Sequence, residues 1–397
     1  MMNPKRRFKK ADGTIFADWK NVPFANIFQE YNVKNTACLP QYTAGKYGLK
    51  PIDNEKIRYN IQNHKAFSIN SLILGIGIEE VGVATNYPGC VSPIYTTYQI
   101  QDHKANSLFI AYYIKNVFAK NKGRITHKST RREYEFEPTE LKKIDIPLPD
   151  SLEEQEKIAN FLFEIDNLIA SAEAEIEKTK NFKKAMLQKM FPKDGESVPE
   201  IRFPGFTDDW EQRKVSEITK FHKQGFYTTE DYNESKKYYL LRGTDLTENK
   251  LILKDTPKID ATEKDYQAFK TEVGDFLIVR SGTVGTYGIV YEDIPAIFGS
   301  YLIDFRFDME QVTNEFFGYF YQSESFKTQL RQIVQQSANT NINAENIKST
   351  SIMLPSIDEQ KRIGEYLGQI DNLITLHQRK ANAYKKLKKA MMQQLFV

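Results

Sequence analysis

A long sequence repeat constrains this chain more than any other feature. The segment LEEQEKIANFLFEIDNLIASAEAEIEKTKNFKKAMLQKMF (152–191) is matched by IDEQKRIGEYLGQIDNLITLHQRKANAYKKLKKAMMQQLF (357–396). From Glu154 and Glu359 onward the copies align at a constant offset of 205 residues, with 16 identities in 39 positions and no gap. The identities gather in EQ, IDNLI and KKAM. A gapless match of this length indicates an internal duplication.

Each copy has the periodicity of one long helix. Apolar residues recur every three or four positions, at Ile158, Leu162, Ile165, Ile169, Ala172 and Ile176, and again at Ile363, Leu367, Ile370, Ile374, Ala381 and Tyr384. Roughly 38 residues at 1.5 Å each would form a rod of about 57 Å. We expect the two helices to pair as a coiled coil, because a single helix cannot bury its own apolar stripe. The alternative is that each stripe packs only against its own domain.

The duplication extends to the start of each unit, where Phe16-Ala17-Asp18-Trp19 corresponds to Thr207-Asp208-Asp209-Trp210. Between these anchors and the long helices the sequences diverge and favour a mixed α/β fold. Strand-like runs span 67–73, 93–100, 275–279 and 296–307, and helical runs span 106–118 and 314–326. The helical runs carry aromatic residues that could stack on bases but fit a core better: Phe109, Tyr112, Tyr113, Phe317, Phe320 and Tyr321.

Four segments follow from this pattern. We predict a first domain over 1–150, a central helix over 151–192, a second domain over 193–355 and a C-terminal helix over 356–397. Their formal net charges are +8, −2, −7 and +4 in the same order, within a total of +3. The second domain is therefore acidic, and a simple argument from basic charge to DNA binding does not apply to it.

The motifs RFPGFTDDWEQRKV (202–215), LPSIDEQKRI (354–363), IDNLI and KKLKKAMMQQLF resemble type I restriction–modification DNA-specificity subunits. So do LPDSLEEQEKI (148–158) and KKAMLQKMFP, and the resemblance covers essentially the whole chain. It implies an α+β fold of two target-recognition domains joined by two long helices in an antiparallel coiled coil, with pseudo-two-fold internal symmetry. The implied partners are double-stranded DNA with a two-part target, two methyltransferase subunits, and restriction or translocase subunits. S-adenosylmethionine, ATP and Mg²⁺ would belong to those partner subunits.

The sequence shows no catalytic motif of its own. It contains no Pro-Pro pair, which the Asn/Asp-Pro-Pro-aromatic motif of adenine methyltransferases requires, and no GxxxxGK[ST] or HExxH motif. The five histidines are scattered, and Cys38 and Cys90 lie far apart, which favours reduced thiols in a cytoplasmic protein. No apolar run reaches the ~18 residues that a membrane span needs. We therefore expect a noncatalytic subunit without metal or cofactor.

Candidate DNA contacts fall into two groups. The first is a basic run in the first domain that could follow phosphates: Lys120, Lys122, Arg124, His127, Lys128, Arg131 and Arg132. The second lies in the acidic domain, where Arg, Asn and Gln could read base edges: Arg280, Ser281, Thr283, Gln335, Gln336, Asn339 and Asn341. The alternative for the basic run is a solvated loop, and the second group could equally belong to an ordinary loop. As a competing function, a coiled-coil scaffold could join two domains that bind ligands other than DNA.

Overall fold

A computed structural model gives the structure of the chain. It describes residues 3–37, 39–45, 48–52, 63–75, 81–84, 87–100, 105–120, 126–127, 135–136, 140, 142–193, 195–229, 233, 235–247, 249–280, 286–336 and 343–396. The chain forms two compact units, one of residues 1–173 with 380–397 and the other of residues 174–379. Each unit contains part of both long helices, so the units divide the chain differently from the four predicted segments.

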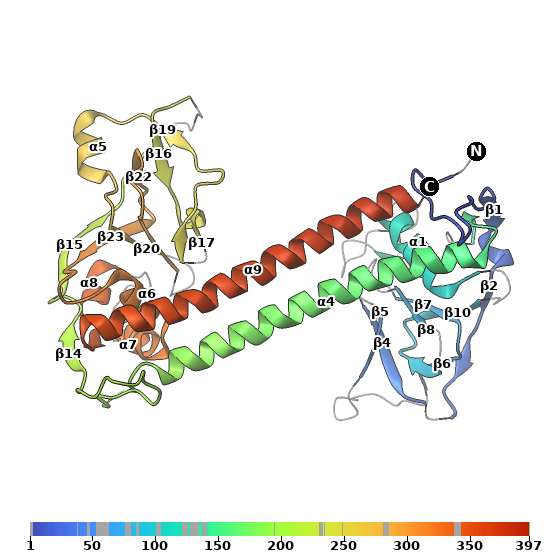
Figure 1. Cartoon of the computed structure of the whole chain (residues 1–397), viewed down its shortest axis with the longest axis horizontal. Helices are drawn as coiled ribbons and strands as arrows, with labels where there is room; N and C mark the ends of the chain where they lie inside the picture. Colours follow the sequence, from blue (N-terminus) through green and yellow to red (C-terminus); the bar gives the residue numbers. More distant parts are fainter. Residues whose placement is uncertain are drawn as a thin grey trace. The chain divides into compact units, whose positions relative to one another are not determined.

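The two long helices form as the repeat predicts. Helix α4 spans Leu152–Lys189 and helix α9 spans Ile357–Leu395 (Figure 1). Inside unit 1 the helices are antiparallel, because Asp166 pairs with Lys388 while the later Glu173 pairs with the earlier Lys385. Ile158, Leu162 and Ile165 of α4 are buried in the same core cluster as Met391 and Leu395 of α9. The apolar stripes therefore face a partner helix as well as their own domain.

In its described residues, the domain of unit 1 contains short strands and helix α1 (Ser107–Lys120). Its strands are β1 (Lys20–Pro23), β2 (Phe28–Glu30), β3 (Val33–Lys34), β4 (Gln41–Gly45), β5 (Gly48–Pro51), β6 (Lys65–Phe67), β7 (Ser71–Leu74), β8 (Val81–Ala84), β9 (Gly89–Val91), β10 (Thr96–Ile100), β11 (Thr126–His127), β12 (Glu135–Phe136) and β13 (Asp145–Leu148). They form sheets in the orders β2-β10-β7-β8 and β3-β6-β9-β4-β5, with pairs β1-β13 and β11-β12. Helix α1 packs its Phe109 and Ile110 into the core cluster that holds Ile158 of α4 (Figure 1).

The sheets in the domain of unit 2 have other strand orders than those of unit 1. Its strands are β14 (Glu211–Lys214), β15 (Thr219–Gln224), β16 (Tyr238–Leu241), β17 (Leu246–Thr247), β18 (Lys250–Leu251), β19 (Lys258–Ile259), β20 (Phe276–Val279), β21 (Tyr287–Ile289), β22 (Ala296–Phe298), β23 (Leu302–Phe307) and β24 (Ser351–Leu354). Their orders are β15-β23-β20-β21-β18-β17, β19-β16-β22 and β14-β24. The helices are α5 (Glu263–Phe269), α6 (Asn314–Gln322), α7 (Glu324–Gln336) and α8 (Ala344–Lys348).

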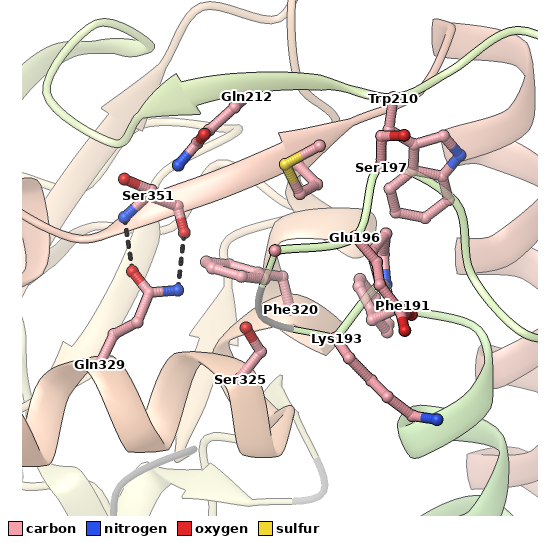
Figure 2. A pocket seen from close by; sticks show the side chains of 13 residues that line it. Phe191, Lys193, Glu196, Ser197, Trp210, Gln212, Phe320, Ser325, Gln329 and Ser351 are labelled. Atoms are coloured by element: carbon pink, nitrogen blue, oxygen red, sulfur yellow. Dashed lines mark hydrogen bonds between the residues drawn. The ribbon is translucent and has the colours of Figure 1, made fainter.

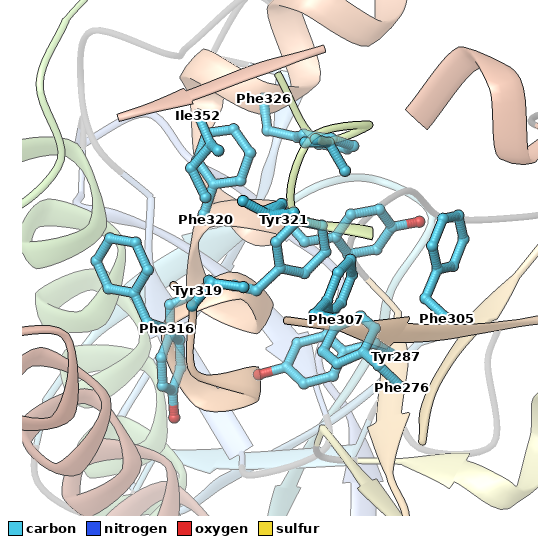
Figure 3. Close-up of a cluster of buried hydrophobic side chains, with 14 of the residues drawn as sticks. Phe276, Tyr287, Phe305, Phe307, Phe316, Tyr319, Phe320, Tyr321, Phe326 and Ile352 are labelled. Atoms are coloured by element: carbon cyan, nitrogen blue, oxygen red, sulfur yellow. The ribbon is translucent and has the colours of Figure 1, made fainter. Parts of the chain in front are cut away.

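An aromatic core joins the six-stranded sheet to α6 in unit 2 (Figure 3). Phe276 stacks on Tyr287 with ring centroids 4.8 Å apart, and Phe307 lies 4.1 Å from Phe317. The six aromatic residues singled out in the helical runs, namely Phe109, Tyr112, Tyr113, Phe317, Phe320 and Tyr321, are all buried. They are core residues and not base-stacking platforms. Close packing also requires a glycine at 318, since a Cβ there would lie 2.3 Å from the Tyr287 ring.

The structure divides three of the predicted elements into two shorter elements each. The run 67–73 turns between β6 and β7, where Asn70 adopts a positive φ of 56°. The run 296–307 breaks at Gly299 between β22 and β23, and the helix predicted over 314–326 ends at Gln322 before α7 begins. Ser323 caps that break by donating its hydroxyl to the Phe320 carbonyl. The predicted fold class is confirmed: mixed α/β domains, an internal repeat and two long helices that pack together.

Candidate functional site

Most of the predicted DNA contacts of the first domain lie beyond what the structure describes. Lys122, Arg124, Lys128, Arg131 and Arg132 fall outside the described residues. Lys120 is the last residue of α1 and His127 belongs to β11, where only the backbone is described. The basic run therefore stays a sequence-based prediction.

In the second domain the side chain of one predicted contact, Arg280, is described. Ser281, Thr283, Asn339 and Asn341 fall outside the described residues, and Gln335 and Gln336 are described only as backbone at the end of α7. Arg280 directly follows β20, is half-buried, and donates its backbone N–H to the Tyr301 carbonyl at 2.9 Å. Tyr301 lines a pocket, and so does Val279, which Arg280 directly follows.

The pocket beside Arg280 has a volume of about 610 Å³. Four chain segments build it: 226–228 after β15, 240–244 at the end of β16, Val279 with Thr286 beside β20 and β21, and 299–301 between β22 and β23. We call it the four-loop pocket. Backbone hydrogen bonds join its segments, from Phe226 N–H to the Phe298 carbonyl and from Gly299 N–H to the Leu241 carbonyl. Sequence reasoning missed this site, because its lining comes from four separate turns.

Arg242 is held in place at the four-loop pocket. Asp245 accepts the Arg242 backbone N–H at 2.7 Å and lies 3.5 Å from both the Nε and the Nη2 of its guanidinium. Nη2 also donates to the Asp255 carbonyl at 2.9 Å. Asp245 itself is buried, while the Arg242 side chain is 42% exposed. The arginine is therefore oriented before any ligand arrives.

A second group of polar contacts fixes the start of each long helix. In unit 1, Arg7 donates to Glu154 through Nε at 2.9 Å and Nη2 at 2.8 Å. In unit 2, Arg202 donates to Glu359 in the same bidentate way at 2.7 and 2.8 Å. Both glutamates are buried, and hydrogen bonding to them raises the pKa of Arg7 and of Arg202. The EQ identity of the repeat marks these glutamates.

The glutamine that follows each glutamate makes the same two kinds of hydrogen bond in both units. Gln155 Oε1 accepts the Asn106 N–H at 2.8 Å, and Gln155 Nε2 donates to the Pro149 carbonyl. Gln360 makes the matching contacts with the Thr313 N–H at 2.9 Å and the Pro355 carbonyl. Each glutamine thereby links its long helix to the residue that precedes α1 or α6.

A tyrosine, an aspartate and a lysine form the third duplicated contact. In unit 1, Tyr112 donates to Asp166 at 2.8 Å, and Lys388 lies 2.6 Å from the same carboxylate. In unit 2, Tyr319 donates to Asp371 at 2.8 Å, and Lys183 lies 2.7 Å from it. We call these groups the triads.

The triads are largely buried. Burial lowers the pKa of Lys183, and burial together with the nearby Asp371 charge raises the pKa of Tyr319. Because the identical IDNLI and KKAM motifs supply the aspartates and lysines, identity between the two copies was the signal that could have found them.

A smaller pocket of about 380 Å³ lies where the linker after α4 meets the second domain (Figure 2). Gln329 of α7 bridges it to β24, accepting the Ser351 N–H at 2.8 Å and donating to the Ser351 carbonyl at 3.0 Å. Trp210 and Phe320 line its inner side. None of the predicted DNA contacts that the structure describes lines this pocket. We therefore interpret the pocket as part of the connection between helix α4 and the second domain.

A pair of buried acids lies in the six-stranded sheet. Burial, together with the charge of the neighbouring Asp275 carboxylate, raises the pKa of Asp304 to about 8. Arg306 pairs with Asp275 at 2.7 Å but reaches Asp304 only at 3.7 Å. Within the described part of the chain, no group of acids, histidines and cysteines could hold a metal ion, and no helix is long and apolar enough to cross a membrane.

Comparison with known proteins gives one family. The model of the type I restriction modification DNA specificity domain matches twice, over residues 16–181 and 207–386. The MjaVIII specificity subunit of a type I restriction enzyme from Methanocaldococcus jannaschii is 28% identical over 64% of this chain and 61% of its own length. The StySPI specificity subunit from Salmonella potsdam is 25% identical over 66% of this chain and 58% of its own length. These matches span about three fifths of each relative.

Two solved structures share the fold. A type I restriction–modification S subunit from M. genitalium aligns with a TM-score of 0.64 and 14% identity, covering 100% of this chain and 99% of that one. A chain from a study of complex assembly and conformational transition of the type I restriction–modification system aligns with a TM-score of 0.53 and 17% identity. That alignment covers 96% of this chain and 97% of the other.

The triads generate a stability prediction. Replacing Asp371 by Asn leaves the largely buried Lys183 without its counter-charge, and we expect unit 2 to lose on the order of 3 kcal/mol of unfolding free energy. The control is Glu173→Gln, which removes the more exposed pair with Lys385 and should cost less than about 1 kcal/mol. Urea unfolding followed by hydrogen exchange in α4 and α9 measures both. Equal losses in the two variants would contradict the assignment of Asp371 as a buried anchor.

The acid pair generates a pH prediction. The folded pKa of Asp304, about 8, lies above its unfolded value of roughly 3.9, so the folded state holds the extra proton between these values. The stability from this group should therefore be complete below about pH 4 and decline as the pH rises through 8. We expect Asp304→Asn to remove that decline in pH-dependent denaturation.

Asp308 provides a control of opposite sign. Hydrogen bonds from Lys220 and Gln311 lower its pKa to about 2, so its contribution is present above about pH 4 and lost as the pH falls towards 2. Asp308→Asn should leave the decline between pH 4 and 8 in place. An unchanged pH profile in Asp304→Asn would show that Asp304 titrates normally.

Proposed function

Because this chain belongs to the family of type I restriction modification DNA specificity domains, we propose that it is the DNA-reading subunit of a type I restriction–modification complex. It directs a methyltransferase to a bipartite, asymmetric target without catalysing methyl transfer or cleavage itself. The relatives in the family are specificity subunits of type I restriction enzymes.

One observation carries the two-part target. The contacts that attach a domain to the long helices are the same in both units: Arg7–Glu154 and Arg202–Glu359, and the two triads. The sheets held by these contacts differ in strand number and order. We call the two long helices and these repeated contacts the frame, and the divergent part of each domain its middle. One constant frame that carries two different middles suits the recognition of two different half-sites, which supports a two-part target.

The long helices also support a partner supplied in two copies. Leu168 and Leu373 occupy equivalent positions of the repeat, and so do Phe182 and Leu387, and all four are exposed. Leu168 lies two residues after Asp166, a rotation of about 200° on a helix, so it points away from Tyr112 and the first domain. Their recurrence at equivalent positions of the two copies is the feature that supports a contact made twice.

We assign this surface to two methyltransferase subunits, which bring S-adenosylmethionine. Restriction or translocase subunits would bring ATP and Mg²⁺ to the assembled complex. Double-stranded DNA is the substrate, the basic run 120–132 is proposed to follow its phosphates, and the cytoplasm is the proposed location. A scaffold joining two domains that bind other ligands is not favoured, since the family match covers both halves of the chain.

Reconstitution tests this function. The purified chain alone should transfer no methyl groups to DNA, because it supplies recognition and not chemistry. With the methyltransferase subunit of its own system and S-adenosylmethionine, it should direct adenine methylation to one two-part sequence, read by sequencing methylated DNA. Methyl transfer by the single chain, or methylation without sequence preference in the complex, would contradict the proposal.

A further inference from the structure

Two tyrosines stand unusually exposed at the four-loop pocket. Tyr227 is 75% exposed and Tyr301 is 69% exposed, the two largest values among the large apolar and aromatic side chains of the described residues. Both line the pocket. An aromatic ring left in water forgoes its burial energy, and a tyrosine combines a large apolar face with a hydroxyl that donates and accepts hydrogen bonds. This pairing at one opening indicates a surface that a ligand covers.

The rim that carries these tyrosines is rigidly built. Gly225 packs so closely that a Cβ there would lie 2.1 Å from the Gly299 carbonyl oxygen. Phe226 bridges to Gly299 in a parallel β-bridge, and Gly225 N–H donates to the Leu302 carbonyl at 3.0 Å. Tyr227 and Tyr301 directly follow these clamped segments. The backbone at both tyrosines is therefore positioned before binding, which reduces the entropy lost when a ligand is bound.

The lining matches the chemistry of a DNA groove. Val279 supplies apolar surface of the kind that contacts a thymine methyl group, and Thr244 and Ser300 supply hydroxyl groups for base edges. Arg242 lines the pocket with a side chain that is 42% exposed, and Arg280 directly follows the lining residue Val279. Asp245, the acid nearest to Arg242 in the sequence, is buried and accepts hydrogen bonds from Arg242 and Thr256. Because Arg242 is paired with Asp245, it offers a ligand the hydrogen-bond donors of an oriented, partly exposed guanidinium and not an uncompensated positive charge.

We propose that the four-loop pocket is where the second domain reads its half of the DNA target. Tyr227 and Tyr301 contact base edges in the groove, and Arg280 and Arg242 contact phosphates or a guanine at its margin. This inference rests on the proposed function and adds the site and the residues that determine specificity. The acidic second domain then binds DNA through a small preformed edge and not through its overall charge.

The experiment compares single variants in the complex with the methyltransferase subunit. Tyr227→Ala and Tyr301→Ala remove exposed rings, so both proteins should fold, and thermal melting checks this. The matched control is Tyr291→Ala, since Tyr291 is a 56%-exposed tyrosine of the same unit outside the four-loop pocket. Methylation rates are measured on the target and on DNAs with one base changed in either half-site.

We expect the two pocket variants to lose roughly 10- to 100-fold of the discrimination at one or more positions of a single half-site. Discrimination in the other half-site, and in Tyr291→Ala throughout, should stay as in the unchanged protein. Wild-type discrimination in both folded pocket variants would overturn the inference while leaving the proposed function intact. A uniform loss of activity on all DNAs would also overturn base reading at this pocket. Absence of sequence-directed methylation by the unchanged complex would instead overturn the proposed function.

Discussion

The structure depends on a buried carboxylate at the start of each long helix. Glu154 and Glu359 are removed from water, and such a charge is costly unless a partner compensates it. Arg7 and Arg202 do so with a bidentate pair of hydrogen bonds, the strongest geometry available to these side chains. Each arginine comes from the segment that enters a domain, so the ion pair couples the entry of the domain to its long helix. Breaking it would leave a buried charge, which makes this joint intolerant of change.

Buried carboxylates further along α4 and α9 also attach the domains to the helices. Asp166 binds Tyr112 of its own domain and Lys388 of the opposite helix, so one carboxylate fixes a domain and a helix pair together. Asp371 repeats this with Tyr319 and Lys183. Because these contacts use side chains of the frame, the remaining residues of each middle are free to differ. This separation of frame from middle explains how one fold can carry two different recognition surfaces.

The main parts of the frame could be predicted from the sequence. The long helices, their apolar stripes and the importance of EQ, IDNLI and KKAM all follow from comparing the two copies. The partners of those motifs could not be predicted: Arg7 and Tyr112 lie far from them in the chain and outside the gapless match. Strand breaks such as the one at Gly299 were missed because a long apolar run in sequence can be two strands that cross into different sheets.

The candidate site was predicted less well than the frame. Arg280 was singled out by its segment, whereas Tyr227 and Tyr301 were not, since only folding shows that they are exposed and share an opening. Net charge was a poor guide for the second domain, because it counts acids such as Asp245 and Asp304 that are buried inside the domain. Local geometry decides what such a surface presents to DNA.

The central claim is that two independent readers share one frame, and exchange of one middle tests it most directly. Residues 20–147 would be replaced by the corresponding segment of another family member that keeps a tyrosine at position 112, leaving Arg7, Trp19 and Glu154 in place. Methylated adenines would then be mapped in DNA from cells that express the hybrid with its methyltransferase subunit. The account predicts a target with one new half-site and the other half-site unchanged. A simultaneous change in both half-sites would contradict it.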